Sequence, residues 1–166
     1  MVHSVEVIAR RAIAYIPTLA KGEAKYGPYI AVEPVYITPL TVDAVLGTLE
    51  QVIAAGHPFI ETPQTPEDWR NWRKIKDPVL AAMKLKNESQ MVKESAYYHI
   101  AWTEDGIVLY LHTLEKEGRR VMFSFDPENR AMAFPHETPL RPIIEAIFAD
   151  MKTLPARGHV DVLTPA

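Results

Sequence analysis

Histidine and tyrosine side chains alternate within two neighbouring apolar segments. Tyr97 and His99 lie in the first segment, and Tyr110 and His112 lie in the second. Asp105-Gly106 separates them and is typical of a two-residue hairpin turn, which would place His99 opposite His112 on adjacent strands. Two such imidazoles could share a metal ion with a carboxylate as third ligand, or one could act as a base oriented by Tyr97 or Tyr110. The simpler interpretation is two partly exposed histidines on a half-polar face.

Two tryptophans form a second candidate site. Trp69 and Trp72 fall on one face of a short predicted helix, interleaved with Arg70, Arg73 and Lys74. Aromatic and arginine side chains dominate the hot spots of protein interfaces. The segment is therefore a candidate binding ridge, although tryptophans packed in the core with basic residues facing water would give the same pattern. Stacking on single-stranded nucleic acid would require more basic charge nearby.

Motifs of the common enzyme classes are absent from the sequence. It contains no glycine-rich phosphate loop, no G-x-S-x-G and no H-E-x-x-H. The chain has 0 cysteines, which excludes disulfides, thiolate zinc sites and a cysteine nucleophile. His57 after Gly56 is most simply a cation at a helix end, and His136-Glu137 a polar helix entry. The sequence therefore leans away from catalysis and predicts no resident metal or cofactor.

Composition and charge favour a globular chain without nucleic-acid or membrane partners. The 166 residues are 48% hydrophobic and carry a net charge of -3, which gives no electrostatic reason to bind nucleic acid. Arg10 and Arg11 interrupt the most apolar N-terminal stretch, so the pattern is not that of a signal peptide. No apolar run is long enough to span a membrane. We therefore expect a soluble, cytoplasmic protein.

Charge is unevenly distributed along the chain. Residues 27–64 contain no Lys or Arg but include Glu33, Glu50 and Glu61, whereas residues 65–93 have an excess of basic side chains. If the acidic stretch stays uncovered, it would attract a basic partner and speed association. Ordinary solubilising carboxylates and a solvated helical face would give the same distribution.

Helices are predicted where apolar residues recur with a 3.6-residue period. One covers residues 41–55, with Thr38 or Thr41 as its cap and Gly56 at its end, and another covers 140–152. Thr65-Pro66 and Asp77-Pro78 are helix starts, and they predict a short helical pair at 66–86.

Strands are predicted where the period is two or the chain is rich in β-branched residues. His3 to Ala14 and Tyr29 to Ile37 are expected to be extended, with Pro34 restricting the latter to an edge or a bulge. From about residue 92 to 135, the pattern and turn signals predict a four-stranded antiparallel meander. The turn between the second and third strands of this meander is either a two-residue Glu117-Gly118 loop or a three-residue Lys116-Glu117-Gly118 loop in which Gly118 is left-handed. We favour the three-residue loop because it brings further apolar side chains to one face. The side chains expected on this apolar face are Tyr98, Ile100, Trp102, Leu109, Leu111, Val121, Phe123, Phe125, Met132 and Phe134.

These elements predict an α+β fold. Residues 1–153 form one domain, with helices 41–55 and 140–152 on the apolar face of the meander, and residues 154–166 form a tail or an edge strand. The N-terminal strands extend the sheet or cover its other face. In general layout the chain resembles some small bacterial immunity or adaptor proteins, a likeness of architecture.

Two functions follow from the candidate sites. The first is a non-catalytic protein-binding protein, immunity-like or an adaptor, that contacts a partner protein or its own copy. The contact would use the ridge of Trp69, Trp72 and Arg73, the acidic stretch 27–64 or the mixed face of the sheet. The alternative is a small ligand- or metal-binding protein, or an enzyme, with a pocket on the sheet. That pocket would be formed by Tyr97, His99, Tyr110 and His112.

Overall fold

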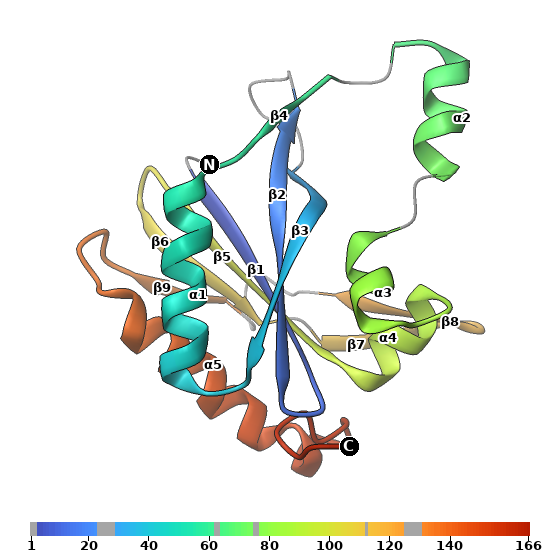
Figure 1. Cartoon of the computed structure of the whole chain (residues 1–166). Helices are drawn as coiled ribbons and strands as arrows, with labels where there is room; N and C mark the ends of the chain where they lie inside the picture. The colour runs from blue at the N-terminus through green and yellow to red at the C-terminus, as the bar shows by residue number, and fades with distance from the viewer. Residues whose placement is uncertain (1–2, 23–28, 62–63, 75–76, 112, 125–130) are drawn as a thin grey trace.

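The computed structural model describes residues 3–22, 29–61, 64–74, 77–111, 113–124 and 131–166. Of residues 72–74, 113–117, 120 and 124 it describes the backbone. The fold is α+β, as predicted, and Figure 1 shows its elements. The strands are β1 (His3–Arg10), β2 (Ile13–Gly22), β3 (Tyr29–Pro39), β4 (Phe59–Ile60), β5 (Ala96–Thr103), β6 (Gly106–Leu111), β7 (Thr113–Glu117), β8 (Arg120–Ser124) and β9 (Ala131–Phe134). The helices are α1 (Val42–Ala55), α2 (Pro66–Lys74), α3 (Pro78–Met83), α4 (Glu88–Glu94) and α5 (Leu140–Thr153), followed by the short 3-10 helix η1 (Pro155–Arg157).

Strand β1 lies in the middle of the main sheet. Among the described residues, the strand order is β3-β2-β1-β5-β6-β9, with β4 beside β2. β1 pairs antiparallel with β5 along most of its length, from His3 opposite Trp102 to Ala9 opposite Ala96. It pairs with β2 near their turn, from Ile8 to Arg10, and the two strands then diverge (Figure 1). The N-terminal strands therefore extend the sheet.

The β1–β2 turn divides a segment that was predicted to be a single strand from His3 to Ala14. Arg11 and Ala12 both adopt positive φ angles, 50° and 62°. Positive φ at both turn residues matches the twist of a two-residue hairpin but is unfavourable for residues with a Cβ. The backbone of Ala12 is held from two sides, because its N–H donates to the Val162 carbonyl (2.7 Å) and its carbonyl accepts from Leu40 (2.9 Å).

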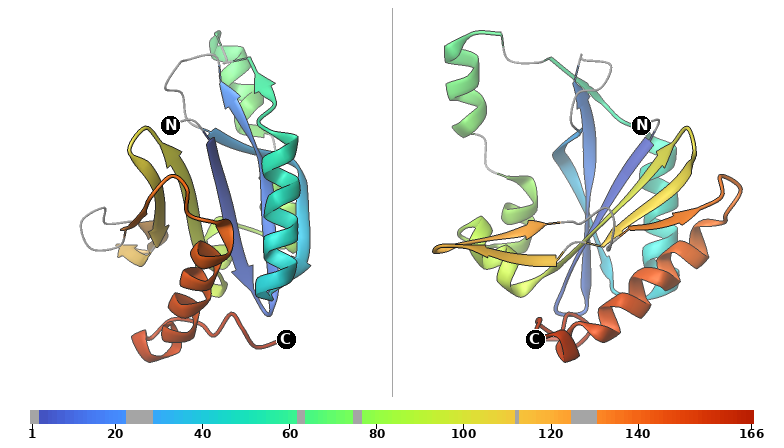
Figure 2. Two further views of the ribbon diagram at one scale, coloured as in Figure 1. Left: turned by 90° about the vertical axis from the view of Figure 1, so that its left-hand side faces the viewer. Right: turned by 180° about the vertical axis from the view of Figure 1, so that it is seen from behind.

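Helices α1 and α5 cover one face of the sheet, and the predicted helices 41–55 and 140–152 are thereby confirmed. Seen from behind in Figure 2, α1 lies beyond the strands. Thr41 caps α1 by accepting from the Ala44 N–H at 3.3 Å, and Gly56 ends it with a positive φ. Fully buried side chains from both helices and three central strands form the core on this face, among them Val5, Val7, Val45, Leu49, Ile100, Leu109, Ile143, Ile144 and Ile147. Val162 from the C-terminal segment is also buried there.

The opposite face carries a second, smaller apolar cluster. Ile8 and Tyr15 of the sheet pack against Val79 and Met83 of α3 and Met91 of α4. Both predicted starts of the helical pair are confirmed, since α2 begins at Pro66 and α3 at Pro78. Helix α4 was not predicted, and the strand pattern begins at Ala96 rather than at residue 92.

The predicted four-stranded meander is correct in part. Strand β6 pairs with β5 and with β9, whereas β7 and β8 form a separate two-stranded sheet within the described part of the chain. Gly118 has the positive φ expected (59°), but the turn is the two-residue Gly118-Arg119, because Glu117 pairs with Arg120. The three-residue loop is therefore wrong. Phe123 belongs to the second cluster, so it does not join the face with Leu109, and Phe125 lies outside the described residues.

Pro34 lies at a bulge in an edge strand, a position that tolerates a residue without an amide donor. Strand β3 is an edge strand, and its register against β2 shifts between Pro17 and Thr18, which leaves Glu33 and Pro34 as a bulge. The hydroxyl of Thr18 donates to the Pro34 carbonyl at 2.8 Å and fixes the bulge. Both alternatives expected for this proline, an edge and a bulge, are thus present.

Candidate functional site

His99 faces Tyr110 across the β5–β6 hairpin, so the predicted pairing with His112 is wrong. The turn is Glu104-Asp105, because Thr103 pairs with Gly106. Gly106 is required as the first residue of β6, where a Cβ would lie 2.5 Å from the carbonyl oxygen of Phe134 in β9. The glycine therefore serves close strand packing rather than the turn itself. His112 lies outside the described residues.

A row of titratable side chains crosses three strands on the face opposite α1 and α5. Glu6 of β1 is directly opposite His99 of β5, which is directly opposite Tyr110 of β6. We call these three residues the sheet row. The ring centroids of His99 and Tyr110 are 5.5 Å apart, and His99 Nε2 hydrogen-bonds to the hydroxyl of the fully buried Ser4. Tyr97 lies on the same face and hydrogen-bonds to Glu6. The structure thus brings Tyr97, His99 and Tyr110 together, as alternation predicted.

Burial determines the electrostatics of this row. It lowers the pKa of His99 to about 4, so the imidazole is neutral at neutral pH. Burial raises the pKa of the Glu6 carboxyl, and the hydrogen bond from Tyr97 partly opposes that effect. Burial also raises the pKa of Tyr97, as does the neighbouring Glu6 charge. The row can exchange hydrogen bonds with a polar group, and it contributes no positive charge with which to hold an anion.

A column of four aromatic rings closes the diverging end of β1 and β2. It runs from Tyr29 of β3 through His57 and His3 to Trp102 of β5. Successive ring centroids are 4.5, 4.3 and 5.4 Å apart. We call these four residues the aromatic column. Sequence reasoning missed His3 and Tyr29, which come from segments far apart in the chain and carry no motif.

His57 bridges the two strands where they no longer pair. Its Nδ1 donates to the carbonyl of Leu19 in β2 (2.7 Å), and its Nε2 accepts from the N–H of Ser4 in β1 (3.2 Å). One nitrogen must carry a hydrogen and the other must not, so the ring is the neutral Nδ1–H tautomer. The prediction of a helix-end cation is therefore wrong. With both nitrogens engaged by backbone, His57 is unavailable as a base or a ligand.

Metal binding by the column finds no support in the described part of the chain. Among the residues that the structure describes, no three histidine or carboxylate side chains gather closely enough to hold a metal ion. The Nε2 of His3 and the hydroxyl of Tyr29 are buried and have no hydrogen-bond partner within the described residues. Burial and the adjacent His57 lower the pKa of His3 to about 4. We infer that the column's main role is to hold the end of the sheet together.

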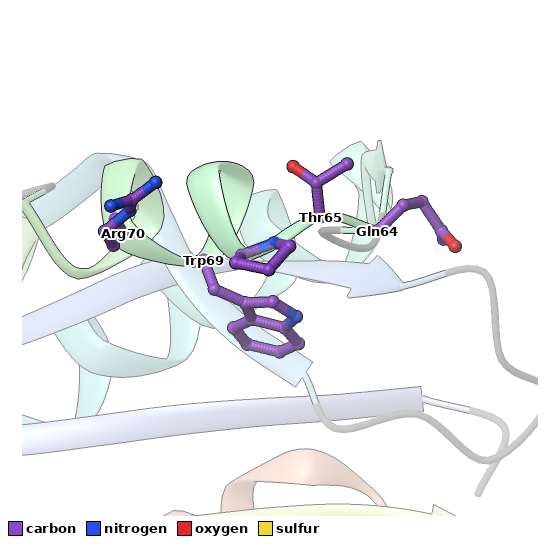
Figure 3. Close-up of a pocket in the computed structure, with 5 residues that line it drawn as sticks. Gln64, Thr65, Trp69 and Arg70 are labelled. Carbon is purple, nitrogen blue, oxygen red and sulfur yellow. The ribbon is translucent and has the colours of Figure 1, made fainter.

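Helix α2 carries Trp69 and Trp72, the two tryptophans of the predicted ridge. Its start is fixed by reciprocal bonds, because the Thr65 hydroxyl accepts from the Asp68 N–H (3.1 Å) while the Asp68 carboxylate accepts from the Thr65 N–H (2.9 Å). Trp69 is 46% exposed and lines an open pocket of about 780 Å³ together with Gln64, Thr65, Pro66 and Arg70. Figure 3 shows these side chains. Trp72 and Arg73 belong to α2, and their side chains lie outside the described part.

The fold is shared with a solved protein of unknown function. No family model matches the sequence, and no curated protein matches it. Among solved structures, the chain is similar to a protein of unknown function, NMB0488, from Neisseria meningitidis, with a TM-score of 0.58 and 14% identity over 88% of this chain and 91% of that one. At this identity the similarity establishes the α+β fold. No helix in the described residues has the length and apolarity needed to cross a bilayer.

Proposed function

We propose that this chain is a non-catalytic protein-binding protein that contacts a partner protein through α2. The observation that carries the proposal is the half-exposed Trp69 on a helix that stands clear of the sheet and the other helices in Figures 1 and 2. The described side chains of α2, from Pro66 to Asn71, are all exposed. A tryptophan left in water forgoes a large apolar burial, and such residues anchor protein interfaces.

Charge indicates what the partner offers. Arg70 is exposed and lines the same pocket as Trp69, within the stretch 65–93 that has an excess of basic residues. A partner surface with an apolar cleft flanked by carboxylates would accept the indole and pair with the guanidinium. The layout resembling small immunity or adaptor proteins is consistent with a role that needs binding alone.

Site-specific crosslinking tests this proposal. A photoreactive benzoylphenylalanine replacing Trp69 should give one dominant adduct in the source cell, and the same replacement at Met132 should not. Met132 is the matched control because it is 40% exposed on β9, another edge of the molecule. With the captured partner purified, Trp69→Ala should weaken its binding at least about tenfold. No adduct at position 69, or unchanged affinity of the variant, would overturn the proposal.

A second measurement separates binding from folding. Because Trp69 is exposed, Trp69→Ala should change the free energy of unfolding by no more than about 0.5 kcal/mol. A larger loss would show that the indole supports the fold. Sedimentation of the free protein should show a monomer at all concentrations, and reversible self-association that Trp69→Ala abolishes would identify a second copy as the partner instead.

The sheet row supports a second candidate, a small-ligand-binding protein or enzyme. The observation in its favour is the mostly buried Glu6 carboxyl, which shares one face with Tyr97, His99 and Tyr110. A thermal-shift screen with metals and neutral polar compounds tests it, since a ligand that binds the folded state raises the melting temperature. A compound that acts at this row should lose its effect in Glu6→Gln. A screen with no shifts would count against this function.

A further inference from the structure

A groove runs between the β3 bulge and α3, on the face opposite α1. It has a volume of about 420 Å³ and is lined by Glu33, Pro34, Val35, Pro78, Ala81 and Ala82. The bulge at Glu33-Pro34 forms one wall, and small side chains at positions 81 and 82 of α3 leave the space open. Glu33 is the charged residue of the lining, and the rest of the lining is apolar.

Hydrogen bonds and buried side chains fix the two walls of the groove. Asp77 caps α3 by accepting from the Val79 N–H at 2.8 Å, and Val79 and Met83 are buried against the sheet. The bulge is held by the hydrogen bond from the Thr18 hydroxyl to the Pro34 carbonyl. A preformed groove of this kind costs little conformational entropy when it is occupied.

Apolar surface continues from the groove along the edge strand. Val35 and Ile37 alternate on β3, so they lie on the same face, and Ile37 is 56% exposed. Ile13, the first residue of β2, is also 36% exposed. An apolar stripe beside an open groove on an edge strand is the surface that an extended peptide segment uses.

The charge of the lining indicates a basic occupant. Glu33 is exposed and is the charged residue of the groove, and strand β3 contains no Lys or Arg. A second copy pairing its own β3 edge here by two-fold symmetry would bring like charges together, and Pro34 and Pro39 remove amide donors from that edge. A basic segment of another protein brings no like charge to Glu33, and it can bind through side chains in the groove without pairing along that edge.

We propose that this groove binds an extended basic segment of the partner protein, with an apolar side chain in the groove and a neighbouring Lys or Arg paired with Glu33. The inference rests on the proposed function in that it names a second contact with a partner protein. It places the partner across the boundary between the acidic stretch 27–64 and the basic stretch 65–93, so that both charge signs of the chain are used.

Displayed random peptides provide a probe that needs no knowledge of the partner. Selection on the whole protein should enrich peptides in which Leu, Ile or Phe stands next to Lys or Arg. A synthetic copy of an enriched peptide should bind at least about tenfold more weakly to Glu33→Lys and to Ala81→Trp, which fills the groove. The matched control is Glu50→Lys, since Glu50 is an exposed carboxylate on α1, and this variant should bind like the native protein.

The two proposals fail separately. Trp69→Ala should retain peptide binding, because Trp69 lies on α2 and does not line this groove. Enrichment without basic residues, or equal binding by native protein, Glu33→Lys and Ala81→Trp, would overturn the groove proposal and leave the crosslinking result at position 69 intact. Melting temperatures of the variants should match that of the native protein, and Glu33→Gln replaces Glu33→Lys if charge reversal lowers it.

Discussion

The backbone N–H of Ser4 donates to Nε2 of His57 over 3.2 Å, at the level where β1 and β2 have separated. The imidazole thus replaces the strand-to-strand hydrogen bonds that the divergence would otherwise leave unmade. His3 and Tyr29 flank its two sides within the aromatic column. A side chain that follows the end of α1 therefore contributes to the integrity of the central sheet.

Replacing His57 with alanine should destabilise the protein by about 2–4 kcal/mol, because the buried Ser4 N–H and Leu19 carbonyl would lose their partner and the column would lose one of its two inner rings. Urea unfolding followed by circular dichroism measures the effect. His136→Ala is the control, because His136 is exposed and makes one bond, from Nε2 to the Glu104 carbonyl. Equal losses for the two variants would contradict the bridging role.

Stability should decrease as the pH falls from about 6.5 to about 4, where the two buried histidines titrate. Burial lowers the folded-state pKa of His3 and His99, so in this range the unfolded chain binds more protons and acid favours unfolding. Their contribution is complete above the unfolded pKa. It reaches at most about 3 kcal/mol for His99 and less for His3, which solvent screens more.

Urea midpoints measured across this pH range test the effect. His99→Gln keeps a hydrogen-bonding group near Ser4 but removes the titration, so its midpoint should depend less steeply on pH than that of the native protein. If the two slopes are identical, His99 is not a source of the acid sensitivity.

Two glycine substitutions should have opposite signs. Gly106→Ala should cost about 2 kcal/mol or more, because its Cβ would meet the Phe134 carbonyl at 2.5 Å and its φ is 143°. Gly47→Ala, inside α1 with open space around the new Cβ, should stabilise the protein by about 0.5–1 kcal/mol. The melting temperatures of both variants test this prediction. An unchanged melting temperature for Gly106→Ala would show that β9 shifts readily to make room for the Cβ.

Local chemistry made the helices predictable. The spacing of apolar residues predicted α1 and α5. Helix starts depend on a few neighbouring residues, and they were predicted from Thr41, Thr65 and Asp77. Alternation likewise placed Tyr97, His99 and Tyr110 on one face. A shift of two residues in register keeps every side chain on its face, so the wrong turn changed the partner of His99 without changing its surroundings.

Features held by distant contacts could not be predicted. Neither Arg11 nor Ala12 favours positive φ, and their turn is supported by the Val162 and Leu40 backbones from elsewhere in the chain. Pairing of β6 with β9 passes over an intervening hairpin that carries its own apolar residues. The aromatic column combines rings from four separate segments, so no local spacing of residues could predict it.

The position of β1 has a consequence for how the chain reaches this structure. The first strand of the sheet lies at its centre, and its partners in β5 are about 90–100 residues away in sequence. Closing so long a loop costs entropy before any contact is gained, and folds dominated by such contacts form slowly. The exposed apolar edge of an unpaired β1 is therefore a hazard during synthesis, and folding chaperones would have most to protect in the interval before β5 emerges.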